Sequence, residues 1–167
     1  MITADEIKRR LDLKPLPREG GYYSESYRAG ELISAGALPE RYENDKEIST
    51  AIYYLLTPDT KSLIHRLPTD EIYHFYLGDP VEMLLLYPDG KGETVVLGPD
   101  IEKGHHVQLV VPRGVWQGSY LIEGGRFALM GTTMAPGFDF EDYEAGNRGE
   151  LIKNYPNFHK LIEVLSS

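Results

Sequence analysis

The chain has 167 residues, of which 41% are hydrophobic and 26% charged, and this composition is typical of one folded domain with a buried core. The formal charge of −9 and the pI near 5.0 argue against a nucleic-acid partner, because phosphate binding needs clustered Lys and Arg. No apolar run is long enough to span a membrane, and the lack of cysteine excludes disulfides and thiolate chemistry. The first residues lack the features of a signal peptide, so we expect a cytoplasmic protein.

The N-terminal segment predicts a short helix. Thr3 precedes Glu6 by the spacing of a capping box, and Ile7 and Leu11 then lie on one helical face. We therefore expect a helix over about residues 4–12, which the prolines and glycines that follow bring to an end.

Short strands dominate the middle of the chain. The alternating segment 22–28 reads as a first strand, and residues 29–46, rich in Gly, Ala, Glu and Asn, predict an exposed loop. From residue 47, apolar segments recur about every ten residues between turn sequences such as PDG, PRG and EGG. The eight strands expected there are 49–57, 61–67, 71–77, 81–88, 93–98, 106–112, 115–122 and 126–134. This pattern favours an antiparallel sandwich or barrel.

The C-terminal segment predicts one or two helices over about residues 148–166. Its apolar residues recur at spacings of three and four, and they are Leu151, Tyr155, Phe158, Leu161, Ile162 and Leu165. Such a face packs on the outer side of a sheet. No repeat or linker interrupts the chain, so we expect a single domain over residues 1–167, with the barrel at about 20–140.

A group of polar residues lies among aromatic and aliphatic ones in LIHRLPTDEIYHFYLGDPVEML, and its members are His65, Asp70, Glu71 and His74. Because side chains alternate along a strand, Glu71, Tyr73 and Phe75 share one face and His74 lies on the other. The short PTD turn predicts that the two strands are antiparallel neighbours, with His65 opposite Glu71. Asp70 then belongs to the turn, and His74 joins the same pocket only if a bulge resets the register.

The expected pair of His65 and Glu71 has chemical consequences. A carboxylate beside an imidazole favours the protonated ring and fixes its tautomer, which gives an acid–base unit near neutral pH. A purely structural hydrogen bond that closes one end of the barrel is the alternative interpretation.

These residues resemble the motifs of the cupin superfamily. His65, Glu71 and Gly78 match its first motif, while Pro112 and Gly114 match the second, with Gln117 in the place of a histidine. The segments EGGYYSESYR, HRLPTDEIYHFYLGDP and VVPRGVWQGS extend the resemblance, over about residues 5–155, to a branch known only as a cupin-like domain of unknown function. The resemblance implies an all-β, double-stranded β-helix (jelly-roll) barrel with short flanking helices. It does not determine the activity.

The resemblance also implies a metal site that this sequence carries only in part. Metal-binding cupins use three His and one Glu, but here Leu67 and Gln117 stand where the second and third His are expected. His65, Glu71 and the weak ligand Gln117 fall short of a three-ligand site for catalytic zinc or iron. No cofactor is therefore favoured, and a divalent metal bound by these three residues is the weaker alternative.

The leading functional hypothesis is a metal-independent isomerase or epimerase that acts on a sugar-like or keto-acid ligand, by analogy with the nucleotide-sugar epimerases among cupins. His65 would remove a carbon-bound proton, Glu71 would orient it, and Tyr73 would return a proton. The candidate ligand-binding residues are Phe75, Gln117 and His74. A non-catalytic binding or storage cupin is the first alternative, and a metal-dependent enzyme is the second. The twelve tyrosines suit a subunit contact, so we expect a homodimer.

Overall fold

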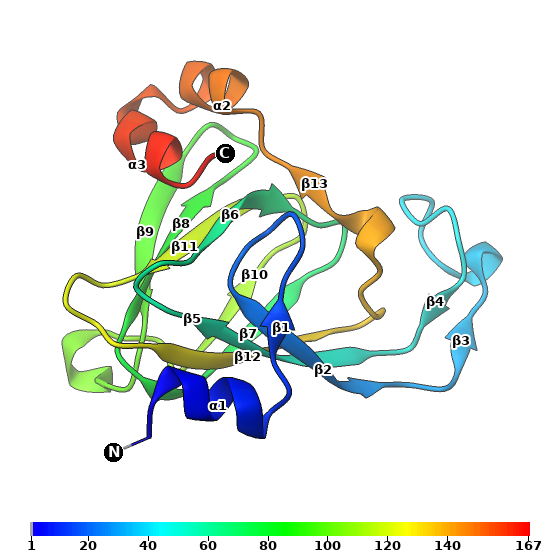
Figure 1. Ribbon diagram of the computed structural model, residues 1–167. Coiled ribbons are helices and arrows are strands. Elements are labelled where there is room, and N and C mark those ends of the chain that lie inside the picture. The colour runs from blue at the N-terminus through cyan, green and yellow to red at the C-terminus, as the bar shows by residue number, and fades with distance from the viewer. Residues whose placement is uncertain (1) are drawn as a thin grey trace.

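Two antiparallel β-sheets packed face to face form the core of the protein (Figure 1), whose computed structural model describes residues 2–167. The first sheet contains, in spatial order, β1 (Lys14–Pro15), β2 (Tyr22–Arg28), β5 (Thr50–Leu56), β12 (Ala128–Met134), β7 (Glu71–Gly78) and β10 (Gln108–Val111). The second contains β13 (Glu144–Ala145), β6 (Lys61–Arg66), β11 (Trp116–Leu121), β8 (Val81–Leu86) and β9 (Gly92–Leu97). Successive strands pass repeatedly from one sheet to the other, which is the topology of a jelly roll. The predicted fold class is confirmed.

The predicted strands all occur, with ends that differ by a few residues. The segment 29–46, expected as a loop, holds the short strand β3 (Leu32–Ile33) and the 3₁₀ helix η1 (Ala35–Ala37), and its last residue begins β4 (Lys46–Glu47). The β3–β4 hairpin projects from the side of the barrel in Figure 1. Three further 3₁₀ helices are η2 (Ile101–Lys103), η3 (Phe140–Asp142) and η4 (Pro156–Phe158).

The expected hairpin between β6 and β7 is wrong. β6 pairs with β11 and β13, whereas β7 pairs with β12 and β10, so residues 67–70 carry the chain from one sheet to the other. A second crossing between β10 and β11 lies beside it: the backbone N–H of Gly114 donates to the Leu67 carbonyl at 2.9 Å, and that of Arg113 donates to Asp70 Oδ1 at 2.8 Å. A short polar link can form either a hairpin or a crossing, and only the partner strands decide between them.

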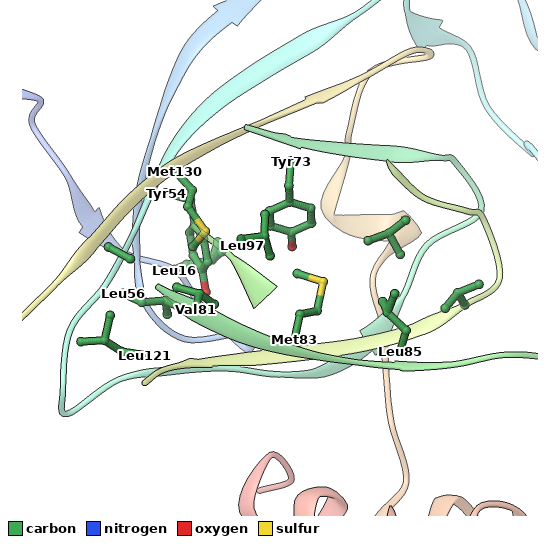
Figure 2. Packing of buried hydrophobic residues seen from close by; sticks show 13 residues of the cluster. Leu16, Tyr54, Leu56, Tyr73, Val81, Met83, Leu85, Leu97, Leu121 and Met130 are labelled. Atoms are coloured by element: carbon green, nitrogen blue, oxygen red, sulfur yellow. The ribbon is translucent and has the colours of Figure 1, made fainter. Parts of the chain in front are cut away.

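The space between the sheets is filled by apolar side chains from both. Figure 2 shows Tyr73, Met83 and Met130 pointing toward one another in this core. All three have nearly no exposed surface, so this part of the barrel is a packed interior.

Helices cover the outer face of each sheet. α1 (Ala4–Arg10) begins at the capping box of Thr3 and Glu6, and its Ile7 packs with Leu55 and Leu129 of the first sheet. On the other side, α2 (Arg148–Asn154) and α3 (His159–Val164) pack on the second sheet, as predicted (Figure 1). Within residues 2–167, no helix has the length and apolar character needed to cross a membrane.

Removing a buried side chain from α3 tests this packing. Ile162 is 0% exposed, whereas Val164 on the same helix is 45% exposed. We expect Ile162→Ala to lower the free energy of unfolding by about 2–5 kcal/mol, because it leaves a cavity against β6 and β8. The matched variant Val164→Ala should change it by less than about 0.5 kcal/mol. Urea denaturation measures both, and equal losses would contradict the packing described.

Candidate functional site

A cavity of about 430 Å³ lies against the first sheet, where Leu67 and the segments before β2 and after β12 complete its lining. Strands β2, β5 and β12 form one wall, and the segment 138–143 forms part of the rim. The acidic residues Glu19 and Glu71 are among those that line it, together with the aromatic rings of Tyr23, Phe140 and Tyr143. This size and mixture of groups suit a small organic ligand.

Glu71 is the titratable group best suited to proton transfer in this cavity. It is the first residue of β7 and is only 6% exposed, and its Oε2 accepts a hydrogen bond of 2.8 Å from Gln117 Nε2. Burial raises the pKa of Glu71, and the nearby carboxylate of Glu19 adds to the rise. The charge of His65 and the hydrogen bonds from Gln117 and Thr132 act in the opposite direction without cancelling it. A carboxyl group with a raised pKa exchanges protons closer to neutral pH than an ordinary glutamate.

A β-bulge in β6 decides where His65 points. Gln117 of β11 pairs with His65 and Ser119 pairs with Ser62, so β6 contains one extra residue over this interval. The extra residue turns Ser62 and His65 to the same inner face, while Ile64 between them packs outward against the C-terminal helices.

The His65 ring lies in the wall behind the cavity. Its Nδ1 donates to the Leu63 carbonyl at 2.7 Å, which leaves Nε2 directed at Glu19 Oε2, 3.7 Å away. The ring stacks on Tyr143 with centroids 5.0 Å apart, and it does not line the cavity. His65 therefore acts on the carboxyl groups of the cavity and does not face a ligand directly.

Glu19 is a site residue that the sequence analysis missed. It lies in the turn before β2, where Ser62 Oγ donates to its Oε1 at 2.8 Å and the Leu63 N–H donates to its carbonyl at 2.9 Å. Gly20, at φ 101°, allows this approach, because a Cβ there would overlap the Lys61 carbonyl oxygen. The sequence signal was a lone acid before two glycines, but nothing in the spacing connects it to residues more than forty positions away.

The remaining predicted site residues lie elsewhere. Tyr73 is buried in the core, where burial and the Glu71 carboxylate hold the pKa of its phenol well above the usual value. Phe75 packs against the same core, and Gln117 lies in the wall behind Glu71. None of the three lines the cavity, so the expected pocket around them is corrected to one centred on Glu71 and Glu19.

His74 is on the outer face of the first sheet. Its Nε2 is 3.0 Å from Thr133 Oγ1, and its Nδ1 is 3.3 Å from Gln108 Nε2. The bulge in β7 comes after His74, at Tyr76, and therefore does not turn it inward. The prediction that His74 binds a ligand in the barrel is corrected.

The metal ligands implied by the resemblance do not come together as a set. Gln117 directs its amide N–H toward Glu71, and the apolar side chain of Leu67 is buried at the second His position. Over residues 2–167, no group of three or more His, Asp or Glu side chains is arranged to hold an ion. These residues do not fit the three-ligand site of a catalytic metal.

A buried ion-pair cluster fixes the rim of the cavity. Lys46 of β4 is 1% exposed, and its Nζ lies 3.3 Å from Asp139, 2.9 Å from Glu141 and 2.9 Å from Asp142. Burial by itself would lower the pKa of Lys46, but these carboxylates outweigh it and the pKa is raised. Arg28 adds a hydrogen bond of 2.9 Å to the Phe138 carbonyl. The segment 138–143 is thus held in place from two sides.

The comparison with known proteins agrees with this architecture. A family model described as the cupin superfamily (DUF985) matches residues 5–146. The chain belongs to the cupin superfamily. It is 34% identical over 155 residues to the uncharacterized protein YML079W of Saccharomyces cerevisiae, and the match covers 88% of this chain and 77% of that protein. The resemblance found in the sequence is therefore confirmed, down to a branch of unknown function.

Solved structures show the same cupin fold. A hypothetical protein from Leishmania major has a TM-score of 0.87 at 30% identity, with 99% of each chain covered. Protein SO0799 from Shewanella oneidensis has a TM-score of 0.88 at 31% identity, with 100% of this chain and 99% of that chain covered. Oxalate decarboxylase from Bacillus subtilis has a TM-score of 0.55 at 15% identity, covering 92% of this chain and 37% of its own. At that identity the likeness concerns the fold alone.

The raised pKa of Glu71 predicts how stability depends on pH. A group whose pKa is higher in the folded state stabilises the fold when protonated, and this contribution is lost as the pH rises through the folded pKa. A neutral Gln at position 71 loses nothing over this range. We therefore expect Glu71→Gln to raise the melting temperature relative to the wild type at about pH 8 and to raise it less at about pH 4.

Differential scanning calorimetry over this pH range measures the effect. The exposed variant Glu102→Gln is the matched control and should show no such trend. A Glu71→Gln variant that is less stable than the wild type at about pH 8 would show that the buried carboxylate stabilises the fold.

Removing Lys46 tests the ion-pair cluster. Lys46→Met leaves Asp142, which is 10% exposed, without its cation, and we expect the free energy of unfolding to fall by about 3 kcal/mol. Lys91→Met breaks the exposed pair with Asp89 and should cost less than about 1 kcal/mol. If urea denaturation showed equal losses of unfolding free energy for the two variants, the buried ion pairs would stabilise the fold no more than the exposed pair does.

Proposed function

We propose that the protein is an isomerase- or epimerase-type enzyme that transfers a proton on a small carbonyl compound bound in the barrel cavity. One observation carries the proposal: Glu71 is a buried carboxyl group with a raised pKa that lines a cavity of ligand size. A buried carboxyl group destabilises the fold. Carboxyl groups of this kind are therefore found mainly at functional sites, where their raised pKa is used.

The geometry favours a different assignment of roles from the one expected from sequence. Glu71 lines the cavity and His65 does not, so we assign the base to Glu71. His65 and Gln117 are positioning residues, since His65 faces Glu19 and Gln117 holds Glu71. Tyr73, with its high pKa and its place in the core, is not suited to returning the proton.

The proposed step is balanced without an added reactant. Ionised Glu71 removes a proton from the carbon next to the carbonyl group, and the electrons of the broken C–H bond move into the carbonyl as an enolate. In a ligand with a hydroxyl group on that carbon, Glu71 returns the proton to the former carbonyl carbon while the hydroxyl proton passes to the former carbonyl oxygen, which gives an isomer. Alternatively, a second acid gives a proton to the original carbon from the other face while Glu71 keeps the one it removed, which gives an epimer. Because Glu19 lines the same cavity, a second carboxyl group is present to deliver that proton.

The same cavity also suits a cupin that binds a ligand without converting it, because its aromatic and carboxyl groups recognise a small molecule in either case. The two functions differ in one measurable property, which is exchange of a carbon-bound hydrogen with solvent. A metal-dependent reaction is not proposed, since the residues at the cupin motifs do not form a three-ligand site.

Deuterium incorporation tests the proposal. Aldoses, ketoses and aminoketones are incubated with the protein in D₂O, and proton NMR follows loss of the signal next to the carbonyl group. We expect incorporation with at least one member, at a rate that rises with pH through the raised pKa of Glu71. Glu71→Gln should lower this rate by about 10²-fold or more, while Glu102→Gln should leave it unchanged. Binding of a carbonyl compound without any incorporation would favour the non-catalytic alternative and contradict the enzyme.

The homodimer and the cytoplasmic location stay predictions. The outer face of the first sheet next to its edge strand β10 exposes Tyr76, Leu77 and Val110. This face is beyond the part that packs against α1, and we propose it as the contact of the expected dimer.

A further inference from the structure

We propose that the ligand of the barrel cavity is an organic cation, a protonated amine carried on an apolar or ring-shaped body. The inference rests on the proposed function in using the same cavity, and it narrows the substrate from carbonyl compounds in general to amino sugars and aminoketones. The inference follows from the acceptors, the charges and the aromatic rings that line the cavity.

The carboxyl groups that line the cavity are hydrogen-bond acceptors. The side chain of Gln117 is 2% exposed, and its Oε1 has no hydrogen-bond partner among the described residues. Its other end holds Glu71, which presents a carboxyl group to the cavity. Glu19 has one oxygen bonded to Ser62, and the other is 3.7 Å from His65. Gln117 does not line the cavity, so the acceptors that a ligand can reach are the carboxyl groups of Glu71 and Glu19, and such a ligand must bring donors.

Three residues around the cavity, His65, Ser62 and Arg28, already donate to protein acceptors. His65 Nδ1 donates to the Leu63 carbonyl, and Ser62 Oγ donates to Glu19. The guanidinium of Arg28 bonds to both oxygens of Glu25 and to the Phe138 carbonyl. Each of these groups would have to lose a partner before it could receive a carboxylate or a phosphate.

The charged residues that line the cavity also favour a cationic ligand over an anionic one. Its acidic residues are Asp12, Glu19, Glu25, Glu71 and Asp139, whereas its only Lys and Arg residues are Lys14 and Arg28. Both cations are paired, Lys14 with exposed Asp12 at the mouth and Arg28 with Glu25. An anionic ligand would therefore approach Glu19 and Glu71 with no free cation beside them.

Aromatic rings at the rim provide the apolar part of the site. Tyr23 and Phe140 meet edge to face at 6.5 Å, and Phe138 and Phe140 do so at 5.3 Å. The faces of such rings carry negative partial charge and attract ammonium groups. Carboxylates and aromatic faces together are the combination that binds organic ammonium ions, so the keto-acid ligand expected from sequence is replaced by an amine.

A set of three probes of nearly equal shape tests the charge preference. Phenethylamine is protonated at neutral pH, 2-phenylethanol is neutral, and phenylacetate is an anion, while all three carry the same ring. Isothermal titration calorimetry with the full chain should show that the ammonium binds at least about tenfold more tightly than the alcohol. The alcohol in turn should bind more tightly than the carboxylate.

Two variants assign the preference to the cavity. Glu19→Gln and Glu71→Gln should each weaken ammonium binding by about tenfold or more and leave 2-phenylethanol binding unchanged, and Glu102→Gln should affect neither. Binding of phenylacetate as tightly as the ammonium, or no ammonium binding at millimolar concentration, would overturn the inference.

The outcome is separable from that of the proposed enzyme, because deuterium incorporation and charge preference are measured independently. Ammonium binding without incorporation in any aminoketone would contradict the proton transfer and retain the amine ligand. Incorporation into a neutral sugar, with no preference for the ammonium probe, would retain the proton transfer and contradict the amine.

Discussion

The carboxyl group of Glu71, held by Gln117 between the two sheets, is the constraint on which the site depends. One group comes from the start of β7 and the other from β11 in the opposite sheet, so their hydrogen bond exists only in the closed barrel. Burial makes the charged form of Glu71 unfavourable and raises its pKa. The same burial that opposes ionisation makes this carboxyl group exchange its proton at a higher pH than an ordinary glutamate, which suits proton transfer.

Local irregularities of the backbone bring the other polar groups to this point. The bulge in β6 turns Ser62 and His65 inward together, and the turn at Gly20 approaches β6 closely enough to place Glu19 against both. A regular strand would have directed Ser62 and His65 to opposite faces. Bulges and positive-φ glycines often occur next to active sites, where they direct a side chain at the expense of regular pairing.

The cavity is lined by acidic residues, and its rim carries aromatic rings that are held in place. The Lys46 cluster and Arg28 hold the segment 138–143, which carries Phe138, Phe140 and Tyr143 to the mouth. A fixed rim lowers the conformational entropy that ligand binding must overcome. The cupin fold itself does not select a ligand, and we propose that the acceptors and ring faces at this site do so.

The sequence by itself determined the eight central strands, the capped helix, the helical C-terminus and the cupin fold, because alternation, capping and short motifs are local signals. It also gave Glu71, His65 and Gln117 as candidate site residues, and the fold brings these three close together. Only the tertiary structure decided that β6 and β7 belong to different sheets, that Glu19 joins the site, and that His65 and Tyr73 lie behind the cavity wall. The physical reason is that sheet pairing, a one-residue bulge and a close turn depend on contacts between distant segments, and no local spacing records them.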